Sequence, residues 1–217
     1  MATSGTATFT LDVSDLCEEA YERCGLDMRS GYDAKSARRS LNLLLLELNN
    51  HQVNLWKTVS LDIPMVQGQT TYVLDAAVND IGNTVLRRDG IDTQIFRLSR
   101  DEYQNRPNKD TQARPSQYWV HRLATPELHV YPAPENSTDI VRTYAMMRIE
   151  DASSAIQTID VPARFIPAVT AGLAYYISLK KAHQLAPNLK TVYDEELQRA
   201  IYEDRERISF IAVPLLG

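Results

Sequence analysis

The residues of this sequence that could do chemistry are few and scattered. His121 and His129 lie on two neighbouring predicted strands and could meet across a hairpin. Paired imidazoles are good ligands for a transition metal. The spacing predicts no cysteine or carboxylate at ligand distance beside them. We therefore interpret both histidines as ordinary strand surface and predict no metal site, with a metal pair as the alternative.

Two pairs of adjacent carboxylates, Glu18-Glu19 and Glu195-Glu196, could suggest glycoside hydrolysis. A glycosidase needs two carboxyl groups that converge on one cleft, one of them desolvated so that its pKa rises. Adjacent residues of a helix point about 100° apart, and both pairs border polar faces. A solvated helix surface is the favoured interpretation. The alternative enzyme is a peptidoglycan glycosidase that uses helix carboxylates such as Glu195 and Glu203.

Recognisable catalytic motifs are absent from the sequence. It contains no P-loop, no glycine-rich dinucleotide fingerprint, no Gly-x-Ser-x-Gly elbow and no His-Glu-x-x-His. Cys17 and Cys24 are one heptad apart on a predicted apolar helix stripe, which is typical of small buried thiols in a reducing compartment. We predict a protein that is not an enzyme, with no catalytic residue and no cofactor.

Composition sets the broad class of the protein. With 217 residues, 44% hydrophobic and 24% charged, the chain can fold around one sizeable core with a smaller appendage. A net charge of −5 argues against a protein that grips nucleic-acid phosphates. The most apolar stretch, 165–179, is shorter than the roughly 20 residues that span a bilayer. No signal peptide is expected at 1–10, and we expect no association with a membrane.

The elements that must position these residues begin with two predicted helices between Leu11 and Leu55. Gly25 should end the first helix, and the second should start after Ser30-Gly31. The second helix carries a stripe of small and apolar residues at helical spacing: Ala34, Ala37, Leu41, Leu44, Leu45 and Leu48. Leu43 and Leu46 widen this stripe beyond what one neighbouring helix requires, so the second side should be covered by another subunit.

The middle of the chain, 56–159, has the character of strands. Apolar residues alternate from Val59 to Ile63, and the Gln67-Gly68-Gln69 turn predicts a hairpin with 71–74 as its return strand. Further predicted strands are 84–87, 91–98, 117–121, 128–131 and 140–147. Asp89-Gly90 is a tight hairpin signal between two of them. A capping box at 99–102 predicts a short helix, and the polar stretch 104–115 a long loop.

The end of the chain returns to helical periodicity. The segment up to Lys181 is apolar almost all round and should form the centre of the helical part. After the last helix comes an apolar tail, 210–217, whose exposure to water would favour aggregation. It should fold back onto the β insertion or insert into a groove on a neighbouring protein. Its apolar side chains are Phe210, Ile211, Val213, Leu215 and Leu216.

The predicted fold class is α+β, with a four-helix bundle formed by the N- and C-terminal helix pairs and an antiparallel β-sheet or sandwich inserted between them. The bundle would comprise 1–55 and 160–209, the insertion 56–159, and the extension 210–217. The candidate partner interface consists of the apolar side chains left over: Leu43, Leu46, Phe210, Ile211, Val213, Leu215 and Leu216.

The predicted β insertion is locally basic, while the last helix is acidic. Its cationic residues are Arg87, Arg88, Arg97, Arg100, Arg106, Lys109, Arg114 and Arg122. Solubility alone explains such a distribution. The alternative is charge complementarity between copies or with a partner, which orients docking more than it adds affinity.

Several segments, in their order along the chain, resemble the head-to-tail adaptors of tailed phages, the group that includes tail tubular protein A and related tail accessory factors. They are Glu19-Ala20-Tyr21-Glu22-Arg23-Cys24-Gly25, Arg39-Ser40-Leu41-Asn42-Leu43-Leu44-Leu45, Asn54-Leu55-Trp56-Lys57, Arg114-Pro115-Ser116-Gln117-Tyr118-Trp119, Leu128-His129-Val130-Tyr131-Pro132-Ala133-Pro134 and Val161-Pro162. Each segment alone is weakly specific, whereas their order and spacing span nearly the whole chain.

The resemblance implies a structural virion protein of the head–tail neck that is made in the host cytoplasm. It implies a ring, of twelve copies, between the portal protein above and a tail or nozzle protein below, with double-stranded DNA passing through the lumen and the C-terminal tail reaching the portal. An acidic or neutral lumen would suit that passage, because a basic one would hold the phosphates. The alternative within the same setting is another head- or tail-completion protein.

Overall fold

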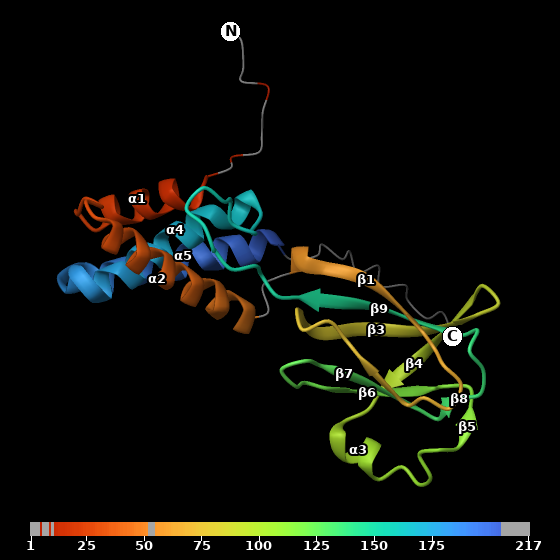
Figure 1. Cartoon of the computed structure of the whole chain (residues 1–217). Coiled ribbons are helices and arrows are strands. Elements are labelled where there is room, and N and C mark those ends of the chain that lie inside the picture. The colour runs from red at the N-terminus through yellow and green to blue at the C-terminus, as the bar shows by residue number, and fades with distance from the viewer. Residues whose placement is uncertain (1–4, 6–8, 10, 52–54, 205–217) are drawn as a thin grey trace, which may run out of the picture. The chain divides into compact units, whose positions relative to one another are not determined.

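The computed structural model describes residues 5, 9, 11–51 and 55–204, and it divides into two compact units (Figure 1). The helical unit comprises residues 1–53 and 149–217, and the β unit comprises 54–148. In the described residues the α-helices are α1 (Val13–Arg23), α2 (Gly31–Asn50), α3 (Arg100–Gln104), α4 (Ile166–Lys181) and α5 (Ala186–Asp204). Short 3-10 helices are η1 (Leu55–Lys57), η2 (Ala163–Phe165) and η3 (His183–Leu185).

The helical unit starts and stops its first helices where the sequence predicts. The Asp12 side chain caps α1 by accepting a hydrogen bond from the backbone N–H of Asp15. Gly25 follows α1 with φ +68, a left-handed conformation that glycine adopts without strain. Ser30 and Asp33 form a reciprocal capping box at the start of α2.

Helix α4 is the centre of the helical unit, as its all-round apolar sequence predicts. It packs against α1, α2 and α5, and nine of its residues are buried. Gly172 allows the closest approach, since a Cβ there would lie 2.8 Å from side-chain atoms of both Leu44 and Tyr193. Phe165, just before α4, is fully buried as well.

The prediction of a four-helix bundle is wrong, although the α+β class holds and the β unit is inserted between the two helical segments of the chain. A seven-stranded curled sheet is the dominant element, and the described residues contain five α-helices. A four-helix bundle shares one apolar seam among helices of equal standing. Here α4 instead occupies the middle, because it is apolar all round and each neighbouring helix packs one apolar stripe against it.

The β unit contains seven strands of one sheet and a separate two-stranded pairing. The strands are β1 (Thr58–Pro64), β2 (Thr71–Val73), β3 (Val78–Arg88), β4 (Ile91–Arg97), β5 (Gln112–Ala113), β6 (Gln117–His121), β7 (Glu127–Tyr131), β8 (Ala133–Pro134) and β9 (Ile140–Met147). The large sheet has the order β1-β9-β3-β4-β6-β7-β2, and β5 pairs with β8.

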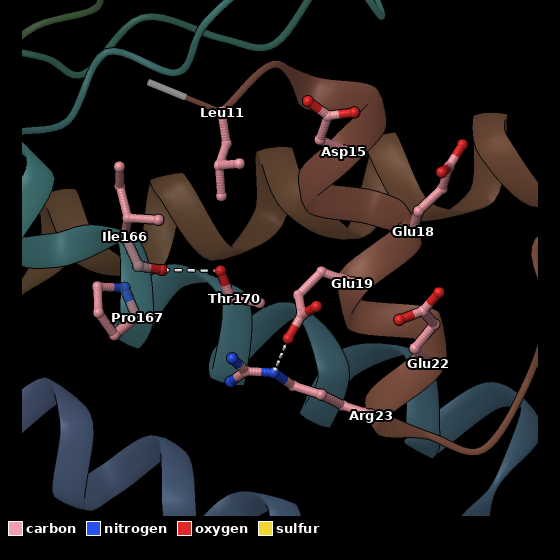
Figure 2. Close-up of a pocket in the computed structure, with 9 residues that line it drawn as sticks. All are labelled: Leu11, Asp15, Glu18, Glu19, Glu22, Arg23, Ile166, Pro167 and Thr170. Atoms are coloured by element: carbon pink, nitrogen blue, oxygen red, sulfur yellow. Dashed lines mark hydrogen bonds and ion pairs between the residues drawn. The ribbon is translucent and has the colours of Figure 1, made fainter. Parts of the chain in front are cut away.

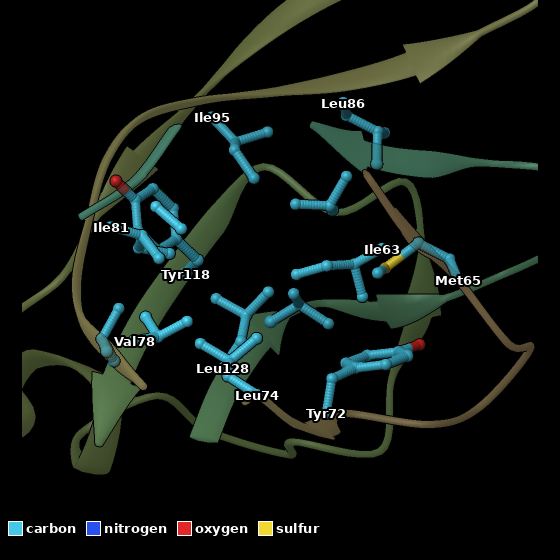
Figure 3. Close-up of a cluster of buried hydrophobic side chains, with 14 residues drawn as sticks. Ile63, Met65, Tyr72, Leu74, Val78, Ile81, Leu86, Ile95, Tyr118 and Leu128 are labelled. Carbon is cyan, nitrogen blue, oxygen red and sulfur yellow. The ribbon is translucent and has the colours of Figure 1, made fainter. Parts of the chain in front are cut away.

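Strand alternation and turn chemistry build this sheet. Asp89 and Gly90, with φ +51 and +80, connect β3 to β4 in the register Arg88↔Ile91, so the predicted hairpin is confirmed. The predicted capping box also starts α3 at Ser99 and Glu102. Alternate side chains point to one interior, where fourteen buried residues form the core of the unit (Figure 3).

Two details of the predicted β region are wrong. The Gln67-Gly68-Gln69 turn does not make a hairpin, because β1 pairs with β9 and β2 pairs with β7, at opposite edges of the sheet. The sheet is also not wholly antiparallel, since β4 and β6 run parallel. Both differences are long-range pairings, which depend on partners that a local hydrophobic pattern does not specify.

Candidate assembly surface

Helix α2 carries one apolar stripe toward the core and a second one toward solvent. Its core stripe is fully buried, whereas Leu43 and Leu46 are each 55% exposed. Residues three apart lie on the same face of a helix. Arg39 and Asn50, both exposed, continue this face above and below the leucines. Spacings of three and four residues with leucines in the middle are typical of a seam that packs against another helix.

Two side chains in the second half of α2 accept hydrogen bonds from the backbone of the returning chain. Asn49 Oδ1 accepts the backbone N–H of Ile149 at 3.0 Å, in a buried position. Asn42 Oδ1 accepts the backbone N–H of Ala152 at 2.8 Å, one turn before the exposed leucines end. The returning chain is thereby fastened to α2, so Leu43 and Leu46 lie on a helix whose position is fixed before any partner arrives.

Glu47 fastens the same helix to α4 and α5. Its carboxylate accepts hydrogen bonds from Tyr176 at 2.8 Å and from Tyr193 at 3.4 Å. Burial, the hydrogen bond to Glu47 and the charge of Glu47 raise the pKa of Tyr176 to about 12. Burial and Glu47 raise the pKa of Tyr193 too. Both phenols therefore remain donors at neutral pH.

Lys180 ties the first half of α2 to the end of α4. Its ammonium donates to the hydroxyls of Ser36 and Ser40, at 3.2 and 2.6 Å. Burial, followed by the charges of Arg39 and Lys181, lowers the pKa of Lys180. The core face of α2 thus combines leucines with polar contacts that specify one register, and the opposite face presents Leu43 and Leu46 between Arg39 and Asn50.

A groove between α1 and α4 forms a second surface feature of the helical unit (Figure 2). It has a volume of about 460 Å³. Leu11, Ile166 and Pro167 give it an apolar side, and α1 gives it a row of carboxylates. The acidic residues of that row are Asp15, Glu18, Glu19 and Glu22, of which Glu19 pairs with Arg23 at 2.8 Å. The groove suits a partner segment with apolar and basic side chains.

The arginines of the β unit are largely paired within that unit. Arg88 Nη2 lies 2.7 Å from a carboxylate oxygen of Asp139, whose side chain is fully buried. Arg87 forms a bidentate pair with Asp92, at 2.7 and 2.8 Å. These contacts neutralise the charges of Arg87 and Arg88, two of the basic residues that the sequence displays.

Asp80 forms ion pairs with two more of those arginines, Arg97 and Arg122. Burial alone would raise the pKa of Asp80, but hydrogen bonds from both arginines and from the backbone N–H of Ile81 outweigh it and hold the pKa below its ordinary value. The ion pairs of Asp80 thus stabilise the fold of the β unit.

The carboxylates considered for hydrolysis do not form a desolvated pair. Glu195 and Glu203 are exposed on α5. Glu18 and Glu19 lie along the open groove of Figure 2, and Glu19 is engaged by Arg23. Cys17 is buried, and burial raises the pKa of its thiol to about 11, so its thiolate is scarce at neutral pH.

The sequence misses one grouping of side chains. The expectation that no carboxylate accompanies His121 and His129 is wrong, because Glu127 lies beside both. In the β6–β7 register His121 stands opposite Glu127, and His129 is two residues further on the same face. Aligning the two strands in the sequence would have revealed this placement, whereas linear spacing does not.

Comparison with protein families identifies the chain. The family model described as SU10 adaptor protein matches residues 11–212. The chain belongs to the SU10 adaptor protein family. Because the match covers both units, it applies to the whole architecture rather than to one segment. No curated protein is similar enough to the chain to count as a match.

Membership of this phage adaptor family makes the chain a structural phage protein and indicates a component of the virion. No described helix of the adaptor is both long and apolar enough to cross a membrane. The predicted interface residues Leu43 and Leu46 of the adaptor are exposed together on α2. Its other predicted interface residues lie outside the described part of the chain: Phe210, Ile211, Val213, Leu215 and Leu216.

Proposed function

We propose that this chain is a head-to-tail adaptor that forms a ring between the portal of a phage head and the tail below it. Twelve copies would surround a lumen through which double-stranded DNA passes without sequence-specific binding. The portal would lie above the ring and a tail or nozzle protein below it, as in the arrangement of tail tubular protein A. The adaptor family supports the structural role. Self-assembly is supported by the leucine seam of α2, the exposed pair Leu43 and Leu46.

The leucine seam supports assembly because it is apolar, contiguous and rigidly held. Leu43 and Leu46 are both more than half exposed on one helix face. Burying a fully exposed leucine gains roughly 1.5–3 kcal/mol, and because these two leucines are 55% exposed, a neighbouring subunit would gain about half of that from each. Repeated around a closed ring, the same contact occurs once per interface.

The charge of the chain is compatible with DNA passage. Its net charge is −5, and the arginines of the β unit engage Asp80, Asp92 and Asp139. Arginines that already pair with carboxylates are poorly placed to bind phosphates. A ring of such subunits would let DNA slide rather than retain it.

Mass measurement tests the assembly directly. We would record native mass spectra and sedimentation of the purified chain, alone and mixed with a portal ring. The expected result is a ring of twelve copies on the portal, formed either before or upon contact. A chain that stays monomeric with the portal at every concentration would overturn the proposal, and binding to a tail component alone would instead favour a completion protein.

A matched pair of variants locates the interface. The double substitution Leu43→Glu and Leu46→Glu should abolish ring formation, because it places carboxylates in the seam. Val192→Glu is the control, since Val192 is an exposed apolar residue on a different helix, α5. Assembly that survives the double substitution, or that fails equally in the control, would show that the seam is not the interface.

Removal of the apolar tail separates docking from ring formation. Deleting residues 210–217 should leave the fold intact and weaken capture of the chain by an immobilised portal. The physical reason is that five apolar side chains would no longer be available to a groove on the portal. If the truncated chain docks with unchanged affinity, the tail does not reach the portal.

A further inference from the structure

The outer face of the β6–β7 pair gathers two histidines and a glutamate. Alternate residues of these strands, among them Val120 and Leu128, point into the β core. The residues between them must point to the opposite face. His121 therefore stands across from Glu127 on that face, and Trp119 stands across from His129.

The ligand atoms of the three side chains already lie close together. The nitrogen and oxygen atoms that His121, Glu127 and His129 would offer are all within 4.8 Å of one another. Glu127 Oε2 lies 3.2 Å from His129 Nε2 and 4.0 Å from His121 Nδ1. Two imidazoles and a carboxylate are the donor set of many catalytic zinc sites, in which a fourth position is open to water.

The environment of His129 makes its Nε2 the nitrogen that is available to a metal ion. Its other nitrogen, Nδ1, lies 3.0 Å from the hydroxyl of Thr71. Nε2 is buried and lies 3.2 Å from Glu127 Oε2, its ion-pair partner, without the geometry of a well-aligned hydrogen bond. An ion shared by two ligands lies off the line that joins them, and a tetrahedral zinc separates its ligands by about 3.3 Å.

Stacked aromatic rings hold the two imidazoles in place. Trp119 stacks on His121 and on His129, with ring centroids 4.8 Å apart in both pairs. Tyr103 of α3 stacks on Trp119 at 5.4 Å. Rings fixed in this way lose little freedom on binding an ion, which favours affinity.

Access to the cluster is from the side of His121. The side chain of His121 is 36% exposed, whereas that of His129 is 14% exposed. An ion can thus enter from solvent beside the more exposed imidazole, and a small rotation of that ring would shorten its 4.0 Å separation from Glu127. Thr71 supplies the outer contact that orients the buried imidazole, as is common for metal-binding histidines.

We propose that His121, Glu127 and His129 form a binding site for one divalent transition-metal ion of the zinc class. The ion ties β6 to β7 and keeps a coordination position open for water or for a side chain of another protein. This site is independent of the proposed adaptor function, since it belongs to the β unit and requires no assembly.

Calorimetric titration of the tag-free full chain with ZnCl₂ tests the site. One ion should bind per chain, and binding should raise the melting temperature by mass action. A second readout is quenching of Trp119 fluorescence by Co²⁺ in a Trp56→Phe background, because Trp119 stacks on both imidazoles. Absence of stoichiometric zinc binding overturns the proposal.

Single substitutions identify the ligands. His121→Gln, Glu127→Gln and His129→Gln should each abolish zinc binding and the zinc-dependent rise in melting temperature, while circular dichroism without metal verifies the fold. Thr71→Val should weaken binding about tenfold. His183→Gln is the matched control, an exposed histidine in η3 of the helical unit that should leave affinity unchanged. Binding at wild-type affinity in any of the three ligand variants overturns the three-ligand site.

Discussion

The helical unit and the β unit differ in how they arrange their apolar and charged side chains. The helical unit buries an all-round apolar helix, α4, and leaves two leucines of α2 in solvent. The β unit encloses its apolar core within a curled sheet and pairs its arginines with its own carboxylates. A surface that is apolar and unpaired invites a neighbour, whereas a surface of closed ion pairs does not. We expect assembly through the leucines of α2 because they lie together on one helix face, although side chains of the β unit such as Ile91 and Phe96 are also more than half exposed.

Truncating a buried side chain in one core at a time has the largest expected effect and tests whether the two units respond separately. Phe165→Ala should destabilise the helical unit by about 3–5 kcal/mol, because Phe165 is fully buried. Native-state hydrogen exchange should show lost protection in α4 and retained protection in β6 and β7. Each unit has its own core and its own compact set of contacts, which is the reason to expect separate responses.

The reciprocal substitution, Leu128→Ala, is the control for that experiment. Leu128 is fully buried in the β core, and its truncation should cost about 2–5 kcal/mol and reduce protection in the sheet but not in α4. Equal loss of protection throughout the chain from either substitution would show that the two units unfold as one.

Loss of the Asp80 carboxylate sharpens the comparison at intermediate magnitude. Asp80→Asn should destabilise the β unit by about 1.5–3 kcal/mol, because charge-assisted hydrogen bonds from Arg97 and Arg122 are lost. The folded protein lowers the pKa of Asp80 below 3.8. The unfolded chain therefore takes up the proton first, so this stability is present above about pH 4 and is lost as pH falls through the lowered pKa.

Urea unfolding at pH 6 and at pH 3 measures this linkage. The stability difference between the two pH values should be smaller in Asp80→Asn than in the wild type. Asp110→Asn, at an exposed position of the same unit, controls for the removal of one carboxylate. A pH difference identical in Asp80→Asn and the wild type would mean that the Asp80 pairs do not stabilise the fold.

Local chemistry explains what could be read from the sequence. The end of α1 at Gly25 and the Asp89-Gly90 hairpin depend on neighbouring residues, and both were predictable. The wide apolar circumference of α2 also pointed to Leu43 and Leu46. The position of α2 against α4, which leaves those leucines outside, required the structure.

Long-range pairing explains what could not be read. The turn at Gly68 suggested a hairpin, but β1 found its partner in β9, which is distant in sequence. Glu127 differs, because it approaches the two histidines through the register of the neighbouring strands β6 and β7, which the sequence yields only when those strands are aligned. The partner of β1, by contrast, is set by the whole sheet and is not contained in the spacing of residues along the chain.

The smallest change in the free energy of unfolding is expected for the outer stripe of α2, and it tests whether that stripe serves assembly or the helical unit itself. Leu43 and Leu46 already face water, so replacing both with glutamate removes little buried area. The free energy of unfolding should stay within about 0.5 kcal/mol of the wild type. Ring formation should nevertheless be lost, because the same carboxylates would be buried at every subunit contact. A variant that is strongly destabilised as a monomer would show that the leucines serve the helical unit itself, and the distinction between its inner and outer stripes would no longer hold.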